Sequence, residues 1–130
     1  MNRIIKFRAW HTELKRMFSA EELGKDEMTL AVDGRGFVNV SGASTKLSQY
    51  ISEMIPMQLT GLKDAGGDDF YEGDIFEDDQ HWYQIIWDDE GSWLAMGIRG
   101  NDDNMSLSEF GNSPDSWIQG NIYENPEWLI

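Results

Sequence analysis

The sequence predicts a mainly β (α+β) fold, in which an N-terminal hairpin and short-helix portion precedes a small SH3-like antiparallel β-barrel. Short apolar runs that alternate with polar residues recur along the chain, and clusters of Gly, Asp and Asn separate them as turns do. The composition is 40% hydrophobic and 12% aromatic, which is enough to form a core in a chain of 130 residues. We therefore expect a folded chain built from short strands.

The N-terminal portion, residues 1–55, begins with a predicted hairpin and a short helix. Residues 4–10 alternate as a strand, and the apolar pair Met17-Phe18 indicates the returning strand. Ser19-Ala20-Glu21-Glu22 has the spacing of a capping box, in which the serine caps the helix and the glutamate reaches back. We expect Gly24 to keep that helix short.

The rest of this portion predicts two strands and an ambiguous segment. Residues 28–32 and 37–40 are strand-like and flank a glycine-rich turn. Residues 41–55 fit more than one structure, and their apolar spacing favours one face of an amphipathic helix. The residues that carry this spacing are Leu47, Tyr50, Ile51 and Met54.

The C-terminal portion, residues 56–130, is predicted to be barrel-like. Its strongest strand is Trp82–Trp87, where Tyr83, Ile85 and Trp87 lie on one face and the other face is also apolar. Both faces are therefore expected to be partly covered, as in a small barrel. The other expected strands are residues 57–60, 71–76, 93–96 and 117–122. Together the two portions are expected to form one compact unit.

Charge is distributed unevenly along the chain. The formal net charge is -14, and residues 61–130 hold 17 acidic and 2 basic side chains, against 7 and 8 in residues 1–60. An acidic portion of this kind excludes nonspecific binding to nucleic acid or to an anionic membrane, because phosphate contacts need cations. The chain has no cysteine, which excludes disulfides and thiol chemistry. With no membrane-length apolar run and no secretory segment, we expect a soluble cytoplasmic protein.

Three short blocks, in this order, resemble the YopX family, whose members are mostly small bacteriophage and prophage proteins. They are Lys6-Phe7-Arg8-Ala9-Trp10, then Leu59-Thr60-Gly61-Leu62-Lys63-Asp64 with Tyr71-Glu72-Gly73-Asp74-Ile75, and finally Gly120-Asn121-Ile122-Tyr123-Glu124-Asn125-Pro126-Glu127. The resemblance spans nearly the whole chain. It implies a phage-encoded, mainly β protein in the bacterial host cytoplasm, and it supplies no established activity or catalytic residue.

The chain departs from the family pattern at several positions. His11 stands where the family often has Asp, Ala65-Gly66 replaces a turn with Lys or Asn, and Asp68-Asp69 replaces Lys and Glu. These differences make the chain more acidic than a typical relative. Within the blocks, we expect Gly73 to provide a sharp entry into a strand and Asp74 to cap nearby amides.

No motif of the sequence predicts catalysis, a cofactor or a metal. The acidic clusters lack the alternating ligands of an EF-hand, so solvated turns are the expected explanation. His11 and His81 are the only imidazoles, and neither has a nucleophile motif beside it. We therefore expect a protein that is not an enzyme, with a small carboxylate-dependent enzyme as the remaining possibility.

Two non-enzymatic functions remain open. One is a protein-binding or regulatory module that contacts a host or phage protein, with homo-oligomers expected. The other is an acidic DNA mimic that occupies the basic groove of a nucleic-acid-binding protein. Trp82 and Trp117 are further possible anchors, because tryptophan is enriched in binding hot spots. The predicted interaction surface consists of Asp68, Asp69, Asp88, Asp89, Glu90, Trp93 and Trp128.

Overall fold

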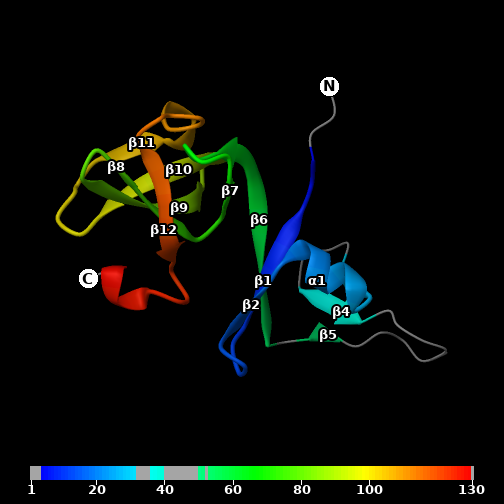
Figure 1. The fold of residues 1–130 in the computed structure, drawn as a ribbon. Coiled ribbons are helices and arrows are strands. Elements are labelled where there is room, and N and C mark those ends of the chain that lie inside the picture. Colours follow the sequence, from blue (N-terminus) through cyan, green and yellow to red (C-terminus); the bar gives the residue numbers. More distant parts are fainter. Residues whose placement is uncertain (1–3, 32–35, 40–49, 52, 130) are drawn as a thin grey trace. The chain divides into compact units, whose positions relative to one another are not determined.

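The computed structural model describes residues 4–31, 36–39, 50–51 and 53–129. The chain forms two compact units (Figure 1). The N-terminal unit is Ile5–Gln58, and the C-terminal unit is Leu59–Ile130 together with Met1–Ile4. The predicted division into residues 1–55 and 56–130 stays a prediction about domain organisation.

In the N-terminal unit, strand β1 (Phe7–His11) is the centre of an antiparallel sheet. It pairs on one edge with β2 (Arg16–Phe18), which confirms the predicted hairpin. On its other edge it pairs with the first half of β6 (Met54–Lys63), where Pro56 lies opposite Ala9. Strand β6 therefore begins before the proline, which the sequence had indicated as a boundary.

Helix α1 (Ala20–Lys25) begins with the predicted capping box. The backbone N–H of Glu22 donates to the Ser19 hydroxyl, and the Ser19 N–H donates to the Glu22 carboxylate, both at 3.1 Å. The second of these bonds lowers the pKa of Glu22, because it stabilises the ionised carboxylate. The helix is short as predicted, but Gly24 lies inside it and does not end it.

We expect Ser19→Ala to destabilise the N-terminal unit by about 1 kcal/mol, because the amide of Glu22 then loses its cap. Hydrogen exchange of the α1 amides, followed by mass spectrometry, measures this loss. The control is Glu21→Gln, which removes the ion pair with Lys6 but keeps both capping-box hydrogen bonds between Ser19 and Glu22, and it should change exchange far less. Equal exchange in both variants would show that the cap contributes nothing.

Three short strands complete the N-terminal unit. Strands β3 (Met28–Leu30), β4 (Phe37–Asn39) and β5 (Tyr50–Ile51) form an antiparallel sheet in that order. Strands β3 and β4 fall within the two strands predicted for this region. The buried core of the unit draws on α1 and on both of its sheets, and it consists of Ala9, Phe18, Leu23, Phe37 and Met54.

The amphipathic helix favoured for residues 41–55 is wrong for the part of that segment that the structure describes. Tyr50 and Ile51 form β5, and Met54 begins β6. Leu47 lies outside the described residues. The short strand β5 is followed by the buried start of β6. Together these two strands produce the same spacing of apolar residues as one face of a helix.

The C-terminal unit is built on a five-stranded antiparallel sheet in the order β11-β10-β9-β8-β12, which curls into a half-barrel. Strand β7 (Asp69–Tyr71) pairs with the second half of β6, and two 3-10 helices, η1 (Leu107–Glu109) and η2 (Pro126–Leu129), complete the unit. This arrangement confirms the predicted mainly β fold. The five strands of the sheet are β8 (Asp74–Asp78), β9 (His81–Asp88), β10 (Ser92–Ile98), β11 (Asn104–Ser106) and β12 (Ser116–Asn121).

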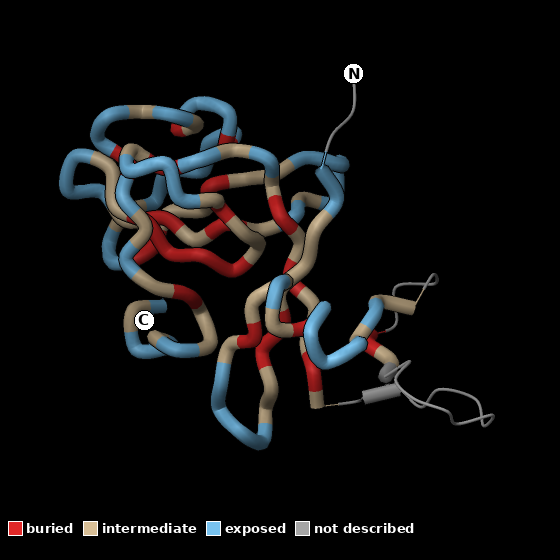
Figure 2. The backbone as a smooth tube through the Cα atoms, turned by 45° about the vertical axis from the view of Figure 1, so that its right-hand side comes forward, coloured by how far each residue is buried: buried red, intermediate tan, exposed pale blue. Residues whose placement is uncertain are grey.

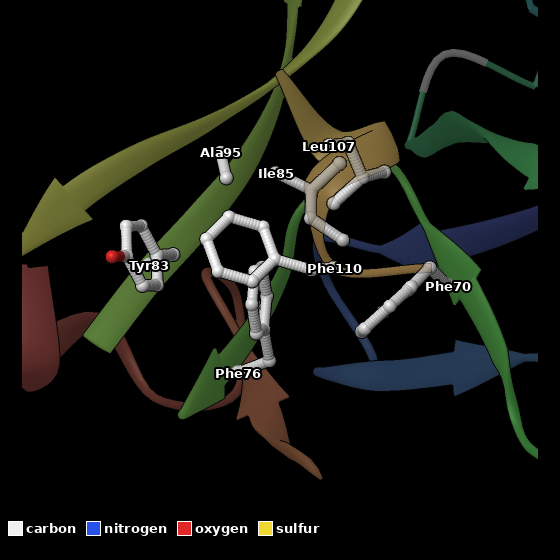
Figure 3. Close-up of a cluster of buried hydrophobic side chains, with 7 residues drawn as sticks. All are labelled: Phe70, Phe76, Tyr83, Ile85, Ala95, Leu107 and Phe110. Atoms are coloured by element: carbon white, nitrogen blue, oxygen red, sulfur yellow. The ribbon is translucent and has the colours of Figure 1, made fainter. Parts of the chain in front are cut away.

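The inner face of this sheet carries an aromatic core, shown in Figure 3. The Phe110 ring lies 4.8 Å from the ring of Tyr83 and 5.2 Å from that of Phe76, measured between centroids. Figure 2 shows that burial follows the strands, whereas the turns between them are exposed. The core cluster consists of Phe70, Phe76, Tyr83, Ile85, Ala95, Leu107 and Phe110.

Candidate interaction surface

The β9–β10 hairpin brings two tryptophans together at one end of the sheet. Trp87 of β9 is the cross-strand partner of Trp93 of β10, and Asp88 pairs with Ser92 one step further along. The turn that follows closes with a hydrogen bond of 2.9 Å from the Gly91 N–H to the Asp88 carbonyl. Gly91 has a φ of 88°, a left-handed conformation that glycine adopts without steric cost.

Trp87 is an exposed side chain that packs against a second tryptophan. Half of it, 52%, is accessible to solvent. Its ring meets the ring of Trp93 edge to face, with the centroids 4.8 Å apart. Trp93 in turn packs against the aromatic core. Trp87 therefore presents a large apolar surface that is already ordered in the unbound protein. This pre-organisation lowers the entropic cost of binding.

The three acidic residues of the hairpin turn, Asp88, Asp89 and Glu90, lie directly beside this surface. Among the residues that the structure describes, no basic side chain forms an ion pair with any of them. The two basic residues of positions 61–130 make other contacts: Lys63 pairs with Asp69 at 2.7 Å, and Arg99 lies over the ring of Trp82. The hairpin turn thus keeps its negative charge.

The structure places the other predicted surface residues away from the hairpin. Trp128, in η2, is half-buried, and its ring lies 5.2 Å from the ring of Trp82. Asp69 is the partner of Lys63, and the amide of Asp68 donates to the buried carboxylate of Asp64. The predicted residues that lie together are Asp88, Asp89, Glu90 and Trp93.

Strand register separates the two acidic turns. Asp78 pairs with Ser116 of β12 and with His81 of β9, which defines the end of the sheet opposite to Asp88. The turn that contains Asp68 is fastened near this opposite end, because the Ala65 N–H donates to the Ser116 carbonyl at 2.7 Å. Asp68 and Asp69 therefore do not join the hairpin carboxylates in one surface.

The sequence did not identify the exposed tryptophan of the hairpin. Alternation placed Trp87 on one face with Tyr83 and Ile85 and predicted that both faces are partly covered. In the structure Tyr83 and Ile85 are buried, whereas Trp87 is half-exposed. Trp117, one of the anchors considered, is also half-exposed at 50%. It lies on β12 opposite Glu77, at the other end of the sheet, so it offers a matched comparison.

Several acidic and hydroxyl groups of the C-terminal unit make hydrogen bonds within the fold. Within the described part of the chain, no group of three or more His, Asp or Glu residues could hold a metal ion. The hydroxyl of Ser116, which is fully buried, donates to Asp78 at 2.5 Å. His81 is exposed, and its Nδ1 lies 3.0 Å from the Asp79 carbonyl oxygen.

Asp64 is a buried carboxylate, 4% exposed, that organises the turn after β6. One of its oxygens accepts hydrogen bonds from the amides of Gly66 and Asp68, at 3.0 and 2.9 Å. The other oxygen accepts from the Ile118 amide of β12 at 3.2 Å. A single side chain thus joins two segments that lie 54 residues apart in the sequence.

The block that contains Gly73 and Asp74 forms the sharp turn into β8 that the sequence predicted. Gly73 has a φ of 88°, and its N–H donates to the Ile85 carbonyl at 2.9 Å. The buried carboxylate of Asp74 accepts a hydrogen bond of 2.7 Å from the Tyr71 amide, which confirms the expected capping role. The Ile122 N–H donates to the Gly73 carbonyl and joins this turn to the end of β12.

The last block forms a tight turn after β12. The Asn121 side-chain oxygen accepts from the amides of Tyr123 and Glu124 at 3.0 and 2.9 Å. The Asn125 side chain folds back to accept from the Asn121 amide at 3.2 Å. A Cβ at Gly120 would overlap that Asn125 side chain. Both blocks of the second half therefore maintain backbone geometry.

These features define a small, mainly β protein whose exposed aromatic surface lies beside an acidic turn. The chain belongs to the YopX family: the family model described as YopX protein matches residues 6–130. No curated protein matches the chain. Among solved structures, the crystal structure of protein EF1440 from Enterococcus faecalis is similar, with a TM-score of 0.64 and 24% identity over 99% of this chain and 100% of that one. This likeness shows the fold alone. Among the described residues, no helix is long and apolar enough to cross a bilayer.

Proposed function

We propose that this protein is a binding module that contacts another protein through the Trp87 surface, defined here as Trp87, Trp93 and the turn Asp88–Glu90. One observation carries the proposal: Trp87 is half-exposed although it is braced by a core-packed tryptophan. A large ring in water gains little for folding, whereas rigid exposed tryptophans dominate the energetics of many interfaces. The proposal contains no catalytic step and needs no cofactor.

The family supports a setting for this contact. The chain belongs to the YopX family, and that membership implies a phage or prophage setting, so the partner is proposed to be a host or phage protein in the bacterial cytoplasm. A second copy of the chain is one such partner. The predicted homo-oligomer would then use the same surface, and light scattering of the purified wild-type chain would detect it.

We expect Trp87→Ala to weaken partner binding by about 30-fold or more, because truncating a hot-spot tryptophan typically removes at least ~2 kcal/mol. The measurement is quantitative capture from lysates of infected host cells by the immobilised chain, followed by titration of the captured protein. Trp117→Ala is the matched control, since that ring is equally exposed at the far end of the sheet.

The proposal is supported if Trp87→Ala loses the partner while Trp117→Ala keeps it. It is overturned if both variants bind like the wild type. The DNA mimic predicts this second outcome, together with binding that collapses between low and moderate salt, because its contacts are carboxylates alone. Circular dichroism of both variants verifies that the fold is retained.

A further inference from the structure

We infer that the partner presents an arginine whose guanidinium stacks on the exposed ring of Trp87, next to the carboxylates of Asp88, Asp89 and Glu90. This inference rests on the proposed function, because it names the chemistry of the partner at the same surface. It deepens that proposal in one respect: a tryptophan hot spot alone would also accept an apolar side chain.

The chain already binds guanidinium groups on its own aromatic rings. In the C-terminal unit, the guanidinium carbon of Arg99 lies 4.8 Å from the centroid of the Trp82 ring. In the N-terminal unit, that of Arg16 lies 4.1 Å from the centroid of the Phe18 ring. Arg99 makes its contact from a left-handed backbone conformation, with a φ of 56°, which is unfavourable for a side chain with a Cβ. The contact with the Trp82 ring therefore helps to stabilise Arg99 in this backbone conformation.

Within the described part of the chain, no guanidinium or ammonium group lies over the Trp87 ring, although its surroundings favour one. No basic side chain among the described residues pairs with the three carboxylates of its turn. In residues 61–130 the acidic side chains outnumber the basic ones by 17 to 2, and both of these basic side chains, Lys63 and Arg99, make other contacts. A cation over the Trp87 ring is therefore attracted both by the quadrupole of the ring and by the negative charges of the turn.

Arginine fits this surface better than lysine. The guanidinium is planar, so it covers an indole face while its edge N–H groups remain free to donate to carboxylates. It is also less strongly hydrated than an ammonium group, so that stacking requires less desolvation. The edge-to-face brace from Trp93 leaves half of the Trp87 side chain accessible to such a ligand.

The test uses short peptides as probes of the full chain labelled with nitrogen-15. The peptide acetyl-Gly-Arg-Gly-Arg-Gly-amide is titrated while the six indole N–H signals are followed by NMR, with assignments from single Trp→Phe variants. We expect saturable shifts of the Trp87 and Trp93 signals. The lysine peptide should bind several-fold more weakly, and the isosteric neutral citrulline peptide should produce no saturable shift.

Two variants separate the ring from the charge. Trp87→Ala should abolish saturable binding, and the triple variant Asp88→Asn, Asp89→Asn, Glu90→Gln should weaken it about tenfold. Asp102→Asn with Asp103→Asn removes charge from another turn and should change the affinity less than twofold. The inference is overturned if citrulline binds as well as arginine, or if arginine shifts all indole signals alike. Its failure leaves the proposed function intact wherever Trp87→Ala still loses the captured partner.

Discussion

Replacing Gly97 with alanine is expected to destabilise the C-terminal unit by about 3 kcal/mol or more, the upper end of the cost of overpacking a well-packed site. A Cβ on Gly97 would overlap the backbone carbonyl oxygen of Asn101, and it would lie 2.6 Å from that of Asp103. Backbone atoms cannot rotate away as a side chain does. The turn between β10 and β11 would have to open, and the Gly97 N–H would lose its 2.8 Å hydrogen bond to the Asp103 carbonyl.

Urea unfolding followed by tryptophan fluorescence measures the loss, because five of the six tryptophans belong to the C-terminal unit. Gly100→Ala is the control in the same turn. Gly100 has a φ of 85° and no described atom within 4 Å of a built Cβ, so alanine there costs only backbone strain of about 1 kcal/mol. If the two variants lost equal stability, the prediction that a Cβ at Gly97 clashes with the backbone of the turn would be wrong.

The strand pattern of the C-terminal unit could be predicted because each strand carries its own alternation. Trp82–Trp87 predicted β9 almost to its ends, His81 and Asp88. Alternation also predicted which residues share a face, but not how far the cover of that face extends. Tyr83 and Ile85 are buried under the aromatic core, whereas Trp87 lies beyond it. The exposure of Trp87, the key residue of the candidate surface, could therefore not be predicted from the alternation.

Two other features of the chain were hidden from local patterns for the same physical reason. Pro56 is accepted in β6 because, among the described strands, this half of β6 pairs only on the edge that faces β1. The spacing of Tyr50, Ile51 and Met54 satisfied a helical face although the chain forms two successive strands there. A local sequence pattern does not show which distant strand a segment will pair with.

The buried carboxylates show this limit most clearly. Asp64 was one acid among 24 in the sequence, and no local feature distinguished it from the solvated acids of the turns. Its environment depends on Ile118 of β12, which the fold alone brings beside it. The carboxylates of this chain therefore fall into two groups. Those in exposed turns are solvated, and a few buried ones accept hydrogen bonds from backbone amides.

The second role predicts a large effect for Asp64→Ala, with a loss of about 3–5 kcal/mol from the C-terminal unit. The substitution leaves three backbone amides, those of Gly66, Asp68 and Ile118, without their acceptor. Hydrogen bonds to a charged group contribute about 1.5–3 kcal/mol each, and a buried donor without a partner costs about 1–3 kcal/mol. Partial access of water to the turn reduces the sum, because an amide that reaches solvent recovers a partner.

A graded series tests the carboxylate itself, again by urea unfolding. Asp64→Asn keeps one acceptor oxygen for the amides of Gly66 and Asp68, but it turns an N–H donor toward the Ile118 amide, so its loss should fall between those of the wild type and Asp64→Ala. Asp69→Asn removes an exposed ion pair with Lys63 and should cost less than ~1 kcal/mol. A chain in which Asp64→Ala was no less stable than Asp69→Asn would contradict the structural role. The expected order instead makes Asp64 the residue that joins β12 to the turn after β6.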